Sequence, residues 1–429
     1  MILIMIATGF FIFKNNHEIM SQRTLISVLK KNAQKNELQF QTEYNDPNLF
    51  QGNLPSVKLP QRMNVQLKQD LFLSATSKGI GSNDVSFDFL RGPLVISHDN
   101  STIYVLSSGA ATLLWRFQIP RSVQLASGRL ALLGSVIVAA TARGGLYAFQ
   151  VTTGRLLWYW QESEAFARMP IAYKNRLVLI RQPQNKKYWN VELFDPVRRK
   201  VTAEVARLNS PLASTPIVSG HLLILATQDG HLDAINMQSR KIAWSNEGSY
   251  NFTCPPFALG RHIYICDQDG YVLSYNRKSG RHAGETHVGA VIESPLAATM
   301  VTPIAVGVTN SGDLVAFDYR HRKRLWRYPL GNVNTHLRLS QIKLTWQSLR
   351  NINFLSAING WTVWAACHAS KICIFDLKTG QLLYRFDLKN RLAGDFLIGS
   401  ENLVWAPVQN GDQMGFERWR EPKPKTPSN

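Results

Sequence analysis

The chain has 429 residues, of which 48 are Lys or Arg and 29 are Asp or Glu, giving a formal net charge of +19 at pH 7. Because 45% of the residues are hydrophobic and 10% are aromatic, the composition excludes a disordered chain and allows a large buried core. The positive charge favours acidic partners, which include nucleic acid, anionic lipid, lipopolysaccharide and acidic protein surfaces. The alternative interpretation is a general basic bias that serves solubility.

The chain begins with an uninterrupted apolar run over residues 1–13. This run is shorter than the roughly 20 residues that a membrane-spanning helix needs, and it has neither a basic stretch before it nor a small-residue cleavage site after it. We expect it to be an export signal or an uncleaved anchor. Residues 14–60 are expected to form a tether, with a short helix over residues 19–31 and a linker with several Pro, Gly and Asn residues over residues 45–60.

One pattern recurs along the rest of the chain: a short apolar strand, a polar turn and a second strand that ends in a large aromatic. Its copies are about 42 residues apart, and one interval is longer by about 16 residues. The first strands of the copies begin near Ile103, Leu146, Val191, Leu232, Val272, Leu314, Ile372 and Met414. A period of this length with four short strands per copy predicts an all-β fold, an eight-bladed β-propeller with four-stranded antiparallel blades.

The fourth copy shows the pattern most clearly. Its strands A to D are expected at residues 216–218, 222–226, 232–235 and 242–244, with Asp229 and Gly230 in the B–C turn.

The last copy contains only three strands, at residues 396–398, 403–406 and 414–419, before a proline-rich end that cannot form a strand. Residues 63–73, in which apolar residues alternate, are predicted to supply the missing outer strand and so to close the ring. The propeller then extends over residues 61–420, and residues 421–429 form a disordered tail.

Five copies place a large aromatic at the same position in strand D: Trp115, Trp158, Trp244, Trp326 and Tyr384. A broad ring at this position packs between neighbouring blades and buries much apolar area. We therefore interpret these aromatics as structural blade-docking residues. The third and fifth copies have Ala203 and Gly284 instead.

Three segments of the repeat resemble a known family: residues 145–158, residues 312–326 and residues 374–384. Each combines an apolar strand, a polar turn and a strand with a Trp or Tyr, as in Thr153-Gly154-Arg155-Leu156-Leu157-Trp158. They are similar to the tryptophan-docking repeat of pyrroloquinoline-quinone-type propellers. That family contains both quinone dehydrogenases and non-catalytic scaffolds.

The resemblance to the dehydrogenases stops at the repeat, because those enzymes carry an adjacent cysteine pair and converging calcium ligands near the quinone. This chain has no Cys-Cys pair, and its candidate acids Asp229, Asp269 and Asp313 are expected in hairpin turns, where Asp is favoured for its turn chemistry. We therefore expect no catalytic residue, no cofactor and no enzymatic activity. A quinone-dependent oxidoreductase is the alternative.

The chain more closely resembles the non-catalytic branch, in particular the propeller lipoproteins of the bacterial outer-membrane β-barrel assembly machine. The resemblance implies a periplasmic scaffold that binds envelope proteins, in outer-membrane protein assembly or a related complex. The apolar segment 1–13 adds the expectation of a tether to the inner membrane. The chain departs from that family in having no cysteine before Cys254 that could carry a lipid, in its basic charge and in its N-terminal tether.

The four cysteines fall into two pairs. Cys254 and Cys266 are expected on adjacent strands of one blade, and Cys367 and Cys373 flank a tight turn in another. Either pair could form a cross-strand disulfide if the chain is exported. The alternative is four buried thiols.

Basic residues gather in the predicted C–D turns: Arg155, Arg198, Arg199, Lys200, Arg240, Lys241, Arg277, Lys278, Arg281, Arg320, Arg322, Lys323, Arg324 and Lys378. Since strands alternate in direction, the A–B and C–D turns share one face of a propeller, and the A–B turns add Lys174, Arg176 and Arg261. Such a face attracts anions, so we expect contact with anionic lipid, lipopolysaccharide or an acidic protein. Nucleic acid is disfavoured, because aromatics are not interleaved with the bases as a stacking platform requires. The alternative is that polar residues simply collect in turns.

The longest interval between copies contains an insertion near residues 331–350, with Arg338, Lys343, Trp346 and Arg350. We expect a surface loop that acts as a contact arm; the alternative is a longer connection that packs down. The histidines show no recurrent ligand spacing, so no metal site is expected.

Overall fold

The computed structural model describes residues 49–50, 73–74, 86–91, 94–98, 102–107, 112–119, 124–126, 130–162, 164–166, 168–183, 185–248, 250–299, 302–330, 343–348, 359–368, 370–392, 396–398, 404–410 and 413–419. The expected apolar segment 1–13, the helix 19–31 and the tail 421–429 lie outside these residues. Within them, no helix has the length and apolar character needed to cross a membrane.

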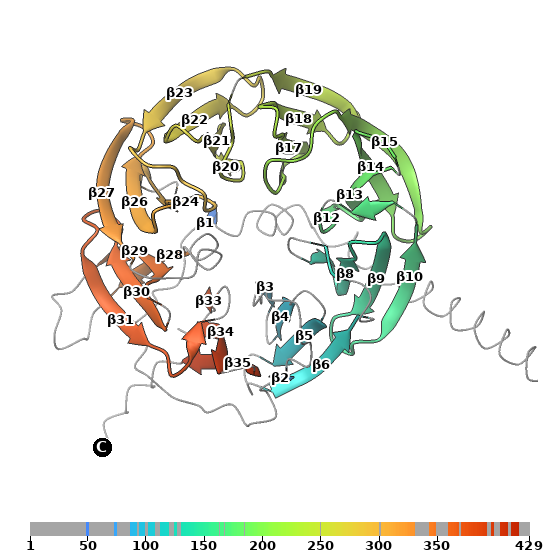
Figure 1. The fold of residues 1–429 in the computed structure, drawn as a ribbon, viewed down its shortest axis with the longest axis horizontal. Coiled ribbons are helices and arrows are strands. Elements are labelled where there is room, and N and C mark those ends of the chain that lie inside the picture. The colour runs from blue at the N-terminus through green and yellow to red at the C-terminus, as the bar shows by residue number, and fades with distance from the viewer. Residues whose placement is uncertain are drawn as a thin grey trace, which may run out of the picture.

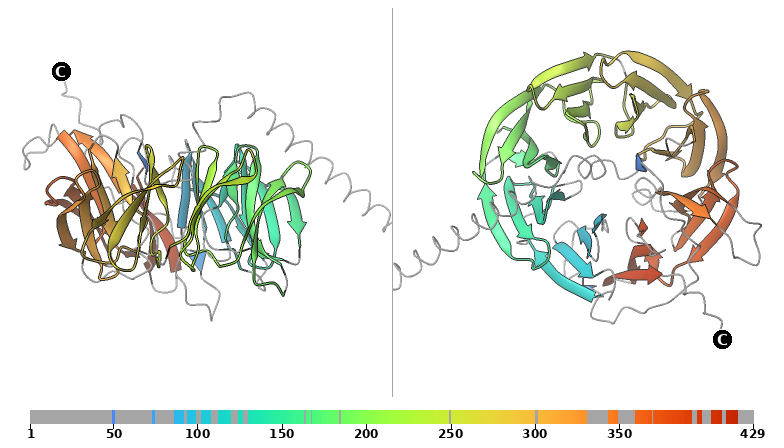
Figure 2. Two further views of the ribbon diagram at one scale, coloured as in Figure 1. Left: turned by 90° about the horizontal axis from the view of Figure 1, so that it is seen from above. Right: turned by 180° about the vertical axis from the view of Figure 1, so that it is seen from behind.

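The described residues form eight β-sheets of four or five strands. The sheets follow one another around a central axis (Figure 1), and the assembly is a flat disc when seen from its edge (Figure 2). Apart from the pairing of the N-terminal strand β1, every strand pairing is antiparallel. Except for the N-terminal strands β1 and β2, the strands of a sheet follow one another from the axis outward in chain order. The predicted all-β propeller of antiparallel sheets is therefore confirmed. We number the sheets 1 to 8 in chain order and name their strands A to D from the axis outward.

The first four sheets lie between residues 86 and 246. Sheet 1 contains β3 (Ser86–Arg91), β4 (Leu94–His98), β5 (Thr102–Ser107) and β6 (Thr112–Gln118). Sheet 2 contains β7 (Ala131–Leu133), β8 (Val136–Ala140), β9 (Gly145–Gln150) and β10 (Leu156–Gln161). Sheet 3 contains β11 (Ala165–Phe166), β12 (Ile171–Tyr173), β13 (Arg176–Gln182), β14 (Trp189–Asp195) and β15 (Lys200–Leu208). Sheet 4 contains β16 (Ile217–Ser219), β17 (Leu222–Ala226), β18 (Leu232–Asn236) and β19 (Lys241–Asn246).

The other four sheets complete the ring of Figure 1. Sheet 5 contains β20 (Phe257–Leu259), β21 (His262–Cys266), β22 (Tyr271–Asn276) and β23 (His282–His287). Sheet 6 contains β24 (Ala297–Thr299), β25 (Ile304–Val308), β26 (Asp313–Asp318) and β27 (Lys323–Pro329). Sheet 7 contains β28 (Lys343–Ser348), β29 (Asn359–Ala366), β30 (Lys371–Asp376) and β31 (Leu382–Asp387). Sheet 8 contains β32 (Arg391–Leu392), β33 (Leu397–Ile398), β34 (Val404–Asn410) and β35 (Gln413–Trp419).

Two short N-terminal strands join later sheets. β2 (Leu73–Ser74) pairs antiparallel with β35 at the outer side of sheet 8, with Leu73 opposite Met414. This pairing involves the end of segment 63–73, whose other residues lie outside the described part of the chain. β1 (Leu49–Phe50) pairs in parallel with β24 at the inner edge of sheet 6, so two residues of the predicted linker form a strand.

The central strands of sheets 2 to 6 are largely buried because neighbouring sheets pack face to face. β8 reads Val-Ile-Val-Ala-Ala, and all five residues are buried, which explains its continuous apolar sequence in place of polar–apolar alternation. The core therefore lies between sheets: Val306 of sheet 6 belongs to one cluster with Trp364 and Phe375 of sheet 7. Each sheet depends on its neighbours for burial of its faces.

The prediction of a surface loop is wrong for Lys343 and Trp346. Both lie in β28, the inner strand of sheet 7, which pairs antiparallel with β29. The sequence Lys-Leu-Thr-Trp-Gln-Ser alternates polar and apolar residues and includes a β-branched and an aromatic residue, which favour strands. Arg338 and Arg350 lie outside the described residues.

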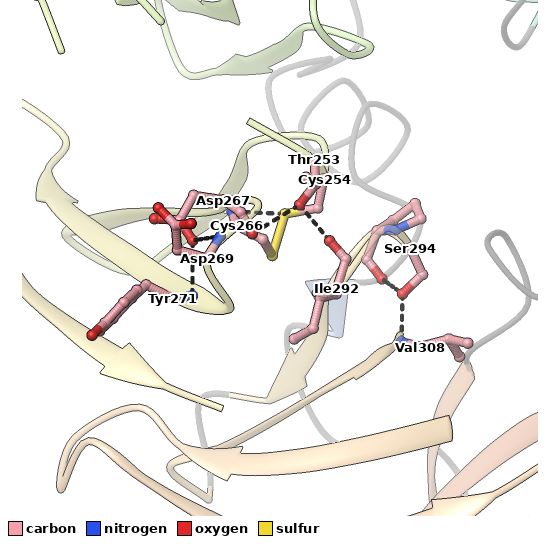
Figure 3. Close-up of a disulfide and its surroundings, with 10 residues drawn as sticks. Thr253, Cys254, Cys266, Asp267, Asp269, Tyr271, Ile292, Ser294 and Val308 are labelled. Atoms are coloured by element: carbon pink, nitrogen blue, oxygen red, sulfur yellow. Dashed lines mark hydrogen bonds between the residues drawn. A yellow bond between two sulfur atoms is a disulfide. The ribbon is translucent and has the colours of Figure 1, made fainter. Parts of the chain in front are cut away.

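The cysteines form two disulfides, Cys254–Cys266 and Cys367–Cys373, with Cα separations of 5.2 and 5.7 Å. Cys254 lies in the connection before β20 and not on a strand, so the first disulfide ties this connection to the end of β21 (Figure 3). The hydroxyl of neighbouring Thr253 donates to the carbonyl of Ile292 in the connection that leads to sheet 6 (2.6 Å; Figure 3). The disulfide thus fixes a loop that joins two sheets.

Replacing Cys254 and Cys266 together by Ala should lower the free energy of unfolding by about 2–4 kcal/mol, because the closed loop no longer restricts the unfolded chain. Denaturant unfolding of both proteins under oxidising conditions measures the difference. A reductant should destabilise the wild-type protein more than the variant, which retains one disulfide. Equal unfolding midpoints without reductant would contradict a stabilising role.

Candidate functional site

Three junctions between sheets are closed by the same side-chain contact. The indole Nε1 of a strand-D Trp donates to a carbonyl in the C–D turn of the next sheet: Trp115 to Val151 (2.7 Å), Trp244 to Arg277 (2.9 Å) and Trp326 to Leu377 (2.9 Å). Each ring lies against a turn glycine, where a Cβ would approach the ring to 2.5 or 2.6 Å: Gly154, Gly280 and Gly380. These indoles therefore set the spacing of neighbouring sheets.

Trp158 makes a different contact. Its ring is buried and lies 6.0 Å from that of Phe194, but its Nε1 has no hydrogen-bond partner among the described residues. The next turn carries Arg199 at the position where the turns that meet Trp115, Trp244 and Trp326 carry Gly. The side chain of Tyr384 lies outside the described part of the structure.

An arginine replaces the indole at the junction of sheets 5 and 6. Gly284 occupies the Trp position of β23, and Arg322 occupies the Gly position of the following turn. The guanidinium of Arg322 covers Gly284 so closely that a Cβ there would collide with it, and its Nη2 donates to the carbonyl of Ala283 (2.6 Å). The bulky group thus comes from the turn instead of the strand.

This contact also bears on an unusual backbone. Arg322 has φ 55°, a left-handed conformation that costs a residue with a Cβ about 1–2 kcal/mol. The hydrogen bond and the packing over Gly284 offset that cost. The junction of sheets 3 and 4 shows the same exchange in sequence, with Ala203 in strand D and Arg240 (φ 58°) in the next turn.

The C–D turns of sheets 3 to 7 share one conformation. The Asp or Asn that ends strand C accepts the backbone N–H groups two and three residues later: Asp195, Asn236, Asn276, Asp318 and Asp376. The fourth residue after each has a positive φ. Because the turns have the same geometry, their intervening side chains emerge on the same face of the disc.

Hydrogen bonding also tunes the acid at the end of β26. Burial raises the pKa of Asp318, but hydrogen bonds from the His321 ring and from the N–H groups of His321 and Arg320 outweigh burial and hold this pKa below its ordinary value. The carboxylate is therefore ionised and committed to its own turn.

The predicted basic-face residues lie in the C–D turns of sheets 2 to 7 or in the first two residues of strand D. Most are exposed: Arg155, Arg198, Lys200, Arg240, Lys241, Lys278, Arg281, Arg320, Lys323 and Lys378. Arg199 is half-buried. We call the surface formed by the C–D turns the basic face.

Three arginines of the predicted set join sheets to one another. Besides Arg322, Arg324 donates from Nη1 to the carbonyl of Val288 (3.2 Å), and Arg277 donates from Nη1 to the hydroxyl of Ser219 (3.0 Å). These three candidates of the basic face therefore make contacts between sheets, and at the junction of sheets 5 and 6 a guanidinium fills the place of an indole.

The opposite face carries mixed charge. Its B–C turns and D–A connections contain acids that are exposed or half-exposed: Glu162, Glu164, Asp229, Glu247, Asp269 and Glu293. They also contain the exposed bases Arg143, Lys186 and Lys187. The disc is thus electrostatically asymmetric.

A buried ionic cluster connects sheets 2 and 3. Arg181, whose side chain is 4% exposed, donates from Nε to Glu192 (2.7 Å) and from Nη1 to Glu162 (2.8 Å), and Glu164 lies 3.3 Å away. Its guanidinium also lies 5.5 Å from the ring of Trp160. Burial raises the pKa of Glu192 despite the nearby arginine. Sequence reasoning missed this cluster, because its members come from three strands and loops and match no motif.

The candidate acids of an oxidoreductase are held in separate hairpins. Thr227 Oγ1 donates to Asp229 (2.5 Å), and Arg327 Nε donates to Asp313 (2.9 Å). Asp269 lies in the turn between β21 and β22. Across the described residues, no group of three or more His, Cys, Asp or Glu side chains is arranged to hold a metal ion.

The fold and its docking contacts define a β-propeller of the pyrroloquinoline-quinone-like class. The structure of BamB from Moraxella catarrhalis superposes with a TM-score of 0.58 at 15% identity, covering 84% of this chain and 97% of that chain. A europium-containing methanol dehydrogenase superposes with a TM-score of 0.56 at 11% identity, covering 76% and 82%. A quinohemoprotein alcohol dehydrogenase from Pseudomonas putida HK5 superposes with a TM-score of 0.56 at 9% identity, covering 79% of this chain and 75% of that chain. These likenesses show the fold alone.

A family model described as outer membrane protein assembly factor BamB matches residues 99–192 and 174–411, well over half of the chain. The protein therefore belongs to this family. A search of curated proteins found no sequence match.

Replacing Gly280 by Ala should destabilise the protein, because the new Cβ would lie 2.6 Å from the ring of Trp244. Gly220 is the matched control: its φ of 65° is close to the 69° of Gly280, but a Cβ there meets nothing within 4 Å. We expect Gly220→Ala to cost about 1 kcal/mol from backbone strain and Gly280→Ala about 2 kcal/mol more. Denaturant unfolding measures both, and equal losses would show that the docking contact is not tight.

Because Arg322 takes the place of an indole at the junction of sheets 5 and 6, substitutions at Gly284 and Arg322 should have non-additive effects on the free energy of unfolding. Gly284→Trp alone should destabilise by collision with Arg322, and Arg322→Gly alone should uncover the junction, each at about 1–3 kcal/mol. The double variant recreates the Trp–Gly contact of the three other junctions and should regain most of the loss. A double-variant cycle measured by unfolding tests this, and simple additivity would contradict it.

Proposed function

We propose that the protein is a non-enzymatic scaffold of the bacterial envelope that binds other envelope proteins during outer-membrane protein assembly or in a related complex. The observation that carries the proposal is the family match over residues 99–192 and 174–411. The likeness to a solved BamB along 97% of that chain supports the same fold.

We further infer that the eight sheets of the described residues are eight blades of a closed ring. The pairing of β2 with β35 supports this, because it supplies sheet 8 with an outer strand from the N-terminal end of the propeller. Closure would protect sheet edges and hold the turns in fixed positions. A rigid disc with fixed turns is suited to docking several partners.

The proposal places the protein in the periplasm. The two disulfides support an oxidising compartment, since such bonds persist outside the cytosol. Residues 1–13 would then act as an export signal or as an anchor in the inner membrane.

Crosslinking and pull-down from native envelope membranes test the proposal, with the full chain and with a chain that lacks residues 1–13. Envelope proteins of outer-membrane assembly should co-purify with both, while membrane association should fall only in the shortened chain. Mass spectrometry of the crosslinks can then identify the residues of the propeller that contact each partner. Recovery of no envelope protein by the full chain would overturn the proposal.

The second candidate, a quinone-dependent oxidoreductase, is favoured only by the fold shared with the two dehydrogenases. Pyrroloquinoline quinone with calcium should therefore produce neither a thermal shift nor dye reduction. A saturable shift accompanied by alcohol-dependent dye reduction would replace the scaffold with an enzyme.

A further inference from the structure

The basic face combines exposed cations with carboxylates that are already occupied. Its turn acids Asp195, Asp318 and Asp376 each accept two backbone N–H groups of their own turn. After the arginines that join sheets are set aside, every C–D turn from sheet 3 to sheet 7 still contributes exposed bases: Arg198, Lys200, Arg240, Lys241, Lys278, Arg281, Arg320, Lys323 and Lys378. This surface therefore has a net positive field.

Exposed apolar side chains lie at the start of strand D, two of them directly after a base of a C–D turn. Of the four large hydrophobic side chains exposed among the described residues, three occur in the first three residues of a strand D: Leu114 (46% exposed), Leu156 (37%) and Ile242 (58%). Leu156 directly follows Arg155, and Ile242 directly follows Lys241. Apolar groups at the level of a basic rim are typical of surfaces that rest on a lipid–water interface.

We propose that the basic face binds an anionic lipid surface, with the disc lying flat on the head groups. The bases are spread over five successive sheets of a flat disc (Figure 2) and do not line one groove. A planar array of phosphate groups contacts all five turns at once, whereas an extended acidic peptide would contact one or two. The inference does not rest on the scaffold function, because it uses only the charge and shape of the disc.

Co-sedimentation of the full chain with vesicles tests this proposal. The protein should bind vesicles of phosphatidylcholine with about a third phosphatidylglycerol, should not bind pure phosphatidylcholine, and should dissociate as salt shortens the range of the attraction. Each base lost from such a surface weakens binding about fivefold. In the variant Arg198→Glu, Lys241→Glu, Lys278→Glu, the affinity for these vesicles should therefore fall by more than about a hundredfold.

The opposite face supplies a matched control. The variant Arg143→Glu, Lys186→Glu, Lys187→Glu changes the net charge by the same amount, and all three positions are exposed in B–C turns. Its vesicle binding should stay within about threefold of wild type. If both variants lost vesicle binding equally, binding would depend on net charge alone and not on the basic face, and the proposal would be overturned. Poly-glutamate binding without vesicle binding would overturn it in favour of an acidic protein partner.

Hydrogen exchange of the wild-type protein provides a test that needs no variant. With anionic vesicles, amides of the C–D turns at residues 196–199, 237–240 and 277–280 should gain protection. The B–C turns at residues 228–230 and 268–270 should exchange as in the free protein. Protection of the B–C turns instead would place the other face on the membrane and overturn the proposal.

Discussion

The contact between strand D of one sheet and the C–D turn of the next is the interaction on which this fold depends. A single sheet cannot bury both of its faces, so each must pack between neighbours. Trp115, Trp244 and Trp326 accomplish this with an indole that donates to a turn carbonyl and lies on a glycine. The left-handed residue of the turn is therefore as important as the aromatic that meets it.

The junctions also show that the contact can be made from either side. Arg322 extends from the turn to cover Gly284, in the place where an indole extends from the strand elsewhere. Volume and one hydrogen bond are retained while the residue types are exchanged. This explains why a repeat that lacks its aromatic in sheet 5 still packs, and why part of the basic charge of the turns is structural.

The same turn geometry links stability to the surface that the molecule presents. Each Asp or Asn that ends strand C is bonded to its own turn, so the turn has a fixed shape. The exposed bases of these turns outnumber their acids. The fold thereby separates a basic face from a face of mixed charge. Family membership defines the class of propeller, and the proposed lipid surface rests on this asymmetry of charge.

Much of the fold was predictable from local signals. The period of about 42 residues, the Asp-Gly turn and the strand-D aromatics predicted the antiparallel propeller, because the turn and strand signals are local and recur in each copy. The same signals located the bases of the C–D turns. They failed for Lys343 and Trp346, where an irregular interval concealed the inner strand of sheet 7.

The sequence by itself determined the repeat, the order of strands A to D in most sheets and the side of the disc to which each turn belongs, because these follow from the alternation of strand direction along the chain. Only the tertiary structure decided what each side chain meets across a junction. Arg322 over Gly284, the Arg181 cluster and the Cys254–Cys266 bond all join residues brought together by packing between strands and loops. The repeat period does not predict these contacts, because each depends on the size and shape of side chains that are far apart in the sequence.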